Sequence, residues 1–254
     1  MLNQLKNRWI AITRPAHQAG KLIKKLESNG ARVIPFPLLE IVEPKAPYLL
    51  QQQLSNLGRF DTAIFISPNA VERALKYISK AQLKSLKIAA VGKKTALSLH
   101  NNGLTVDYFP DKLFNSEALL ALDAMQLVKN QHIIIFRGEG GRDLLRDTLR
   151  QRGASVTYRN VYARRCPADN IGLLKQHYHQ QKLDIIVLTS GESLQHLLRL
   201  ANNEEWISHV PLLVGSKRIK QQFQQQFAGK LWVAPDPSDE TIFHTLQTRM
   251  DSYL

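Results

Sequence analysis

The chain has 254 residues, of which 44% are hydrophobic, and its formal net charge is +13 at neutral pH. The length fits one large or two modest domains, and no segment approaches the roughly 18 consecutive apolar residues of a membrane span. Its single cysteine, Cys166, excludes an internal disulfide and a cysteine-rich metal site. We therefore expect a folded protein without a bound metal, and the lack of an apolar secretory segment at the start predicts the cytoplasm.

The charge suits three kinds of partner: nucleic acid, a membrane surface or a highly anionic small molecule. Lys and Arg residues are scattered along the whole chain instead of being gathered in one helix or tail. There is also no aromatic and basic platform of the kind that binds nucleic acids. We therefore expect a small-molecule ligand, and neither nucleic acid nor membrane as a partner.

Short apolar runs alternate with amphipathic stretches, which is typical of β-α-β units and parallel sheets. The pattern predicts strands at 9–13, 32–36, 61–66, 87–91, 105–109, 132–136, 155–162, 184–189, 210–214 and 230–234. It predicts helices at 16–29, 47–57, 69–78, 79–85, 93–102, 115–128, 140–152, 169–180, 191–200, 215–227 and 238–250. The fold class is therefore α/β.

The chain repeats itself at a fixed interval. Arg14 falls on Arg137, Ser67 on Ser190 and Gly92 on Gly215, each pair 123 positions apart. Two copies are too few for a solenoid, so we interpret the repeat as an internal duplication that gives two lobes. The simplest division cuts the chain near residue 130, and a second one exchanges pieces between the halves.

Long extended segments at matching positions favour the exchange. The segments 34–44 and 157–167 are each long enough to leave one lobe and enter the other, and their prolines suit connectors better than central strands. We therefore expect two flavodoxin-like parallel-sheet lobes, 1–38 with 166–254 and 39–165, joined by a two-stranded connector with a cleft between them.

Candidate binding residues follow the predicted strands, because open parallel sheets bind ligands beyond the carboxyl ends of their strands. Small, hydroxylic and basic residues gather at these positions and are suited to anions; we select Arg14, Ser67, Asn69, Arg137, Thr189, Ser190 and Lys217. Each serine could instead only cap a helix. No metal-ligand cluster and no nucleophilic triad occurs at strand ends.

Tyr162 breaks the repeat, since its counterpart is Leu39. Duplication alone does not require a phenol there. Tyr162 could serve only in packing, or its hydroxyl could donate a proton or hydrogen bond to a leaving group.

The order and spacing of these blocks resemble the uroporphyrinogen-III synthase family. The resemblance covers nearly the whole chain and rests on Thr13-Arg14-Pro15, Ser67-Pro68-Asn69, Gly92-Lys93-Lys94, Ser116-Glu117, Arg137-Gly138-Glu139-Gly140-Gly141-Arg142, Val161-Tyr162-Ala163-Arg164, Thr189-Ser190 and Val214-Gly215-Ser216. Pro68 and Gly191-Glu192 depart from the commoner helix starts, and Glu192 would bring an anion near an anionic substrate.

The resemblance implies two α/β lobes and an enzyme that works without metal or organic cofactor in haem and sirohaem biosynthesis. Separately from the resemblance, we expect a monomer. The substrate would be hydroxymethylbilane, a chain of four pyrroles with eight carboxylates, which is closed into uroporphyrinogen III with inversion of the last ring. Tyr162 matches the family's tyrosine and would be the acid that helps hydroxide leave, since a phenol carries its proton at neutral pH. The alternative is a non-catalytic two-lobed protein that binds or senses an anionic ligand.

Overall fold

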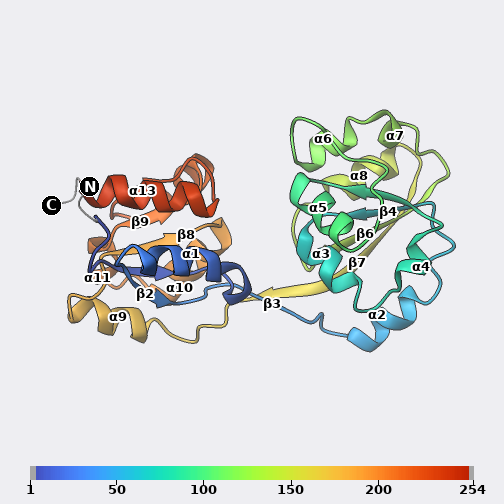
Figure 1. Ribbon diagram of the computed structural model, residues 1–254. Helices are drawn as coiled ribbons and strands as arrows, with labels where there is room; N and C mark the ends of the chain where they lie inside the picture. Colours follow the sequence, from blue (N-terminus) through green and yellow to red (C-terminus); the bar gives the residue numbers. More distant parts are fainter. Residues whose placement is uncertain (1–3, 252–254) are drawn as a thin grey trace. The chain divides into compact units, whose positions relative to one another are not determined.

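The structure, a computed structural model, describes residues 4–251. The chain forms two compact units (Figure 1). One unit contains the residues up to Glu40 together with those from Arg165 onward, and the other contains Ile41–Arg164. The chain therefore enters the second unit after Glu40 and returns after Arg164.

The first unit is built on a five-stranded sheet in the order β10-β9-β8-β1-β2. Its strands are parallel wherever their pairing is described. The elements are β1 (Trp9–Ile12), α1 (Ala16–Ser28), β2 (Arg32–Pro35), α9 (Gly172–His179), β8 (Ile185–Leu188), α10 (Gly191–Ala201), α11 (Trp206–His209), β9 (Leu212–Val214), α12 (Lys217–Phe223), β10 (Leu231–Val233) and α13 (Asp239–Asp251).

The second unit is built on a five-stranded sheet in the order β3-β7-β6-β4-β5. Here β5, β4, β6 and β7 pair in parallel. The elements are β3 (Glu40–Val42), α2 (Pro47–Leu54), β4 (Thr62–Phe65), α3 (Pro68–Ala74), α4 (Lys80–Leu83), β5 (Lys87–Ala90), α5 (Lys93–Asn101), α6 (Ser116–Leu120), α7 (Asp123–Gln126), β6 (His132–Gly138), α8 (Leu144–Gln151) and β7 (Ser155–Arg165).

Each sheet has an apolar core on both faces, which explains why the central strands β1, β8, β4 and β6 consist mainly of apolar residues. In the first unit α1 and α13 cover one face, while α9, α10 and α12 cover the other. In the second unit α2, α3 and α5 cover one face, while α6, α7 and α8 cover the other. This layering confirms the predicted α/β class with two parallel sheets.

Two aspartates that are also 123 positions apart, Asp61 and Asp184, tie neighbouring strands together. The Asp61 carboxylate accepts the His132 N–H at 2.7 Å, and the Asp184 carboxylate accepts the Trp9 N–H at the same distance. In both sheets, the aspartate just before one strand thus accepts the backbone N–H at the start of the neighbouring strand.

The expected strand at 105–109 is wrong, because only Tyr108 forms a bridge, to Ala89. The Asp107 carboxylate accepts the Ile88 N–H at 2.8 Å, so the side chain takes a donor that a strand carbonyl would otherwise use. Pro110 then ends the extended segment, since it has no N–H to donate.

Two expected helices also differ. The helix expected at 115–128 is divided into α6 and α7, because Leu122 takes an extended conformation (φ −65°, ψ 140°). The helix expected at 140–152 begins only at Leu144, after Gly140 and Gly141 with φ of 72° and 93°. Within residues 4–251, no helix combines the length and the apolar character required to cross a bilayer.

Candidate functional site

A bulge within β7, opposite the end of β6, sets the position of Tyr162. Strands β6 and β7 pair in register up to Arg137 and Asn160, and the next pair joins Gly138 to Tyr162, so Val161 is the extra residue. The Glu139 N–H donates to the Tyr162 carbonyl oxygen at 2.9 Å and fixes the strand beyond the bulge. Bulges often redirect a side chain beside a functional site.

The Tyr162 ring lies directly over Gly138. A Cβ atom at position 138 would lie 2.4 Å from Cε2 and 2.6 Å from Cζ of the ring, closer than real Cβ contacts allow. The backbone of Gly138 is not left-handed, so glycine is required here because the missing side chain leaves space for the phenol ring. Only 3% of Tyr162 is exposed, so the ring is held in one place.

The phenol meets Ser67 at the end of β4. Tyr162 Oη and Ser67 Oγ are 3.2 Å apart, and either hydroxyl can donate. Ser67 Oγ also accepts the Ala70 N–H at 3.1 Å and thereby caps α3. When Ser67 donates to Tyr162, the phenol keeps its own proton for another acceptor.

A cavity of about 200 Å³ opens beside Tyr162 within the second unit. Its wall consists of strand-end and loop residues, among them Val91, Ser116, Arg137, Gly138, Tyr158 and Tyr162. Within residues 4–251, no group of three or more His, Cys, Asp and Glu side chains is arranged to hold a metal ion. The polar groups here are hydroxyls, amides and guanidinium groups.

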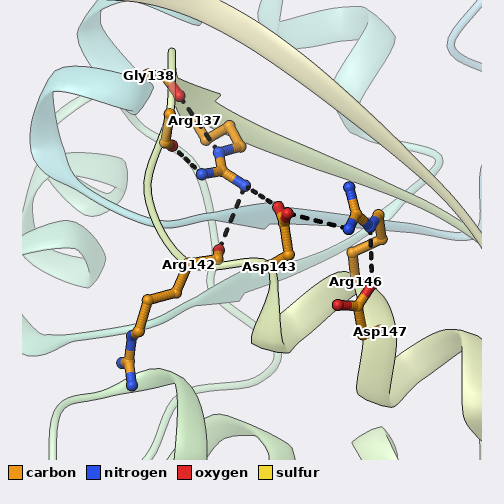
Figure 2. Close-up of polar contacts among 7 residues, drawn as sticks. Arg137, Gly138, Arg142, Asp143, Arg146 and Asp147 are labelled. Atoms are coloured by element: carbon orange, nitrogen blue, oxygen red, sulfur yellow. Dashed lines mark hydrogen bonds and ion pairs between the residues drawn. The ribbon is translucent and has the colours of Figure 1, made fainter.

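Arg137 orders the loop that bounds this cavity (Figure 2). Its guanidinium donates to the carbonyl oxygens of Gly138 (3.2 Å), Gly140 and Arg142 (3.4 Å) and pairs with the Asp143 carboxylate at 3.2 Å. The residue is 5% exposed. A buried arginine with this many acceptors holds the loop in shape.

Tyr158 adds an aromatic face to the same cluster. The Arg137 guanidinium lies 4.3 Å from its ring centroid and the Arg146 guanidinium 5.3 Å from it. Arg146 also pairs with Asp143 at 3.0 Å and with Asp147 at 2.9 Å. Cation–π contacts and ion pairs together keep the start of α8 next to the loop.

Arg14, the counterpart of Arg137, is also buried and is 8% exposed. Its guanidinium pairs with Asp239 at the start of α13 and donates to the Pro237 carbonyl oxygen. Both arginines that were selected as anion-binding residues therefore bind groups of their own unit.

The other selected residues lie at strand ends, as expected from the motif positions. Asn69 is in the first turn of α3, and Thr189 lies just before Ser190 at the end of β8; all three are partly exposed. Ser190 Oγ caps α10 by accepting the Ser193 N–H at 3.0 Å. Lys217 begins α12 and is exposed. Thr189, Ser190 and Lys217 belong to the first unit, whereas Ser67, Asn69, Arg137 and Tyr162 belong to the second.

Glu43 ties the segment after β3 to α3. Its carboxylate pairs with Arg73 at 2.7 Å and Lys76 at 3.2 Å, and it accepts the Tyr77 hydroxyl. The Tyr77 hydrogen bond, followed by the two cations, lowers the pKa of Glu43 despite an opposing desolvation effect. Burial and the Glu43 carboxylate raise the pKa of Tyr77 to about 12.

Sequence reasoning missed the packing of Gly138 on Tyr162 and the contacts of Tyr158. The asymmetry between Leu39 and Tyr162 was a signal for the phenol. No local signal reveals the bulge, because it depends on how β7 pairs with β6.

The model of the family described as uroporphyrinogen-III synthase HemD matches residues 20–244. The uroporphyrinogen-III synthase of Escherichia coli is 31% identical over 245 residues, which are 94% of this chain and 99% of the relative. The chain belongs to the uroporphyrinogen-III synthase family. The synthase of Synechococcus elongatus is 33% identical over 202 residues, covering 77% of this chain and 75% of the relative.

Solved structures of uroporphyrinogen-III synthases have the same fold. The Helicobacter pylori protein matches with a TM-score of 0.64 and 15% identity, over 95% of this chain and 99% of that one. A mutant of the Thermus thermophilus protein matches with a TM-score of 0.64 and 16% identity, over 96% and 99%. Family membership favours an enzyme over the non-catalytic binding protein that the sequence left open.

Proposed function

We propose that this chain closes hydroxymethylbilane into uroporphyrinogen III, with inversion of the terminal pyrrole ring and loss of water. Membership of the uroporphyrinogen-III synthase family supports the reaction. The observation that carries the proposed mechanism is the pair of hydroxyls, Tyr162 Oη and Ser67 Oγ, 3.2 Å apart beside a cavity that Tyr162 lines.

The first step is acid-assisted loss of the substrate's hydroxyl group. A proton passes from the hydroxyl pair to the leaving oxygen, the C–O bond breaks, and water departs from an azafulvene whose pyrrole nitrogen carries the positive charge. Ser67 stabilises the phenol oxygen that has lost its proton by donating a hydrogen bond. General acids of this kind typically accelerate a step by about 10²–10⁴-fold.

The second step is attack on the azafulvene by a substituted carbon of the last pyrrole. The resulting spiro intermediate opens and closes again with that ring inverted, and a proton leaves a pyrrole carbon and returns to the hydroxyl pair. The sum is one molecule of water lost and no net change in the protein. Because uncatalysed closure gives the uninverted isomer, the protein's main contribution is to position the reacting carbons.

Carboxylate binding is assigned to groups at the strand ends. Ser67, Asn69, Thr189, Ser190 and Lys217 are the proposed contacts, together with backbone amides at helix starts. Arg14 and Arg137 act differently in this proposal. Their buried guanidinium groups already bind protein acceptors, so they shape the loops around the substrate.

The proposed organisation is an internal duplication with lobes of 1–38 plus 166–254 and of 39–165, linked through 34–44 and 157–167. The 123-residue repeat and the two compact units support this division. We further propose a cytoplasmic monomer, with no nucleic acid as a partner.

Incubation of the purified chain with hydroxymethylbilane tests the function. After oxidation of the products to porphyrins, chromatography separates isomer III from isomer I. We expect isomer III with the chain present and isomer I in the blank. Isomer I in both samples would contradict the proposal.

A further inference from the structure

The loop between Tyr108 and α6 exposes two large apolar side chains. Leu113 is 66% exposed and Phe114 is 48% exposed, and all of residues 111–115 are exposed. Neither side chain contributes to the core clusters of the second unit as they are described. Apolar side chains that stay together in water often mark a contact surface for a ligand.

Phe114 is held in place and not merely projected into solvent. Its ring stacks on Phe109, with centroids 5.8 Å apart and planes inclined by 11°. A Cβ atom at Gly92 would lie 3.4 Å from the Phe114 Cβ, so the loop packs against the end of β5. The two rings form a small aromatic platform, defined here as Phe109 and Phe114, and Leu113 precedes Phe114 in the same exposed loop.

Residues close to the platform in the chain line the cavity beside Tyr162. Val91, which precedes Gly92, lines that cavity, and so does Ser116, two residues after Phe114. Lys93 and Lys94 follow Gly92 in the first turn of α5, and both are exposed. Phe114 therefore packs at Gly92, whose neighbours in the chain are a cavity-lining residue on one side and two exposed lysines on the other.

We propose that the aromatic platform packs against one pyrrole ring of the tetrapyrrole, while Lys93 and Lys94 bind that ring's carboxylates. This inference rests on the proposed function. Each pyrrole of hydroxymethylbilane combines a flat π-system with two anionic side chains, and the platform with its lysines offers the complement of both. Phe114 is thus a substrate-positioning residue outside the acid machinery, and aromatic contacts of this kind are directional.

The test compares Phe114→Ala with Leu127→Ala. Alanine at 114 keeps the Cβ that packs against Gly92, so the loop is preserved. Leu127 is 79% exposed and lies outside the site, which makes it a matched control for loss of an exposed apolar side chain. We expect Phe114→Ala to raise KM for hydroxymethylbilane about tenfold with kcat within about threefold. Phe114→Trp should restore KM, and Leu127→Ala should leave both constants unchanged.

A binding assay with uroporphyrin III, monitored through the fluorescence of the porphyrin, compares Phe114→Ala with Leu127→Ala without turnover. Weaker binding to Phe114→Ala than to Leu127→Ala supports the platform even if the wild type forms no isomer III, in which case only the proposed function fails. Equal KM values and equal uroporphyrin affinity in the two variants would overturn the platform, even when the wild type forms isomer III.

Discussion

Gly138→Ala tests how Tyr162 is positioned. The added methyl group would lie 2.4 to 3.0 Å from three atoms of the Tyr162 ring. Because Tyr162 is 3% exposed, the ring can move only by displacing buried side chains or by shifting into the adjoining cavity, and either movement changes its contact with Ser67. Overpacking of this kind costs about 1–3 kcal/mol in the free energy of unfolding, and loss of the bond to Ser67 adds about 0.5–1.5 kcal/mol.

Activity should fall further than this loss of stability explains. A phenol displaced by several tenths of an ångström no longer meets the leaving hydroxyl and Ser67 together, so kcat should approach that of Tyr162→Phe. The double variant Gly138→Ala/Tyr162→Phe should be little slower than either single variant, because both changes remove the same contribution. Urea unfolding and initial rates of isomer III formation provide the two measurements.

Gly20→Ala provides the matched control. Gly20 lies inside α1, and no atom outside its local backbone lies within 4 Å of the added Cβ. This variant should gain about 0.5–1 kcal/mol, since alanine suits a helix better than glycine. A wild-type kcat in Gly138→Ala would refute the claim that Gly138 positions the phenol. So would a double variant Gly138→Ala/Tyr162→Phe in which the losses of activity of the two single variants add fully.

Three further predictions concern Ser67, Glu43 and Tyr77. Ser67→Ala removes a helix cap and the partner of the phenol, so we expect the free energy of unfolding to fall by about 1–2 kcal/mol and kcat to fall as well. Ser79→Ala removes the cap of α4 and should lower stability without lowering kcat. Equal kcat values for the two variants would contradict the role of Ser67. The lowered pKa of Glu43 gives stability that is present above its unfolded pKa of about 4.3 and is lost as the pH falls through the folded pKa. The raised pKa of Tyr77 gives stability that is present below about pH 10 and is lost as the pH rises towards 12. The melting temperatures of Glu43→Gln and the wild type should therefore converge in acid. Those of Tyr77→Phe and the wild type should converge in strong base. A difference in melting temperature that stays constant at all pH values would contradict the pKa shift assigned to that residue.

The central strands could be predicted because local sequence determines them. Ile185–Leu188 and Thr62–Phe65 are short apolar runs between turn residues, and both are fully buried strands. The failure at 105–109 has a tertiary cause. Its apolar residues suit a strand, but Asp107 binds the Ile88 N–H with its side chain and leaves only Tyr108 as a bridge.

The positions of the site residues were partly accessible from sequence. Motifs at strand ends located Ser67 and Arg137, since a helix follows both β4 and β6. Their partners were not accessible, because the contact between Ser67 and Tyr162 joins residues that are 95 positions apart. Likewise, the acceptors of Arg137 depend on the left-handed conformation of Gly140 and Gly141, which only the folded loop reveals.

The most direct test of the central claim is single-turnover conversion of hydroxymethylbilane by Tyr162→Phe. We expect isomer III to form about tenfold to a hundredfold more slowly than with the wild type, because Ser67 can still donate a proton less efficiently. The free energy of unfolding should fall by no more than about 0.5–1.5 kcal/mol, the contribution of the bond to Ser67, so the variant stays folded. Wild-type turnover in a folded Tyr162→Phe variant would contradict the claim that this phenol is the acid.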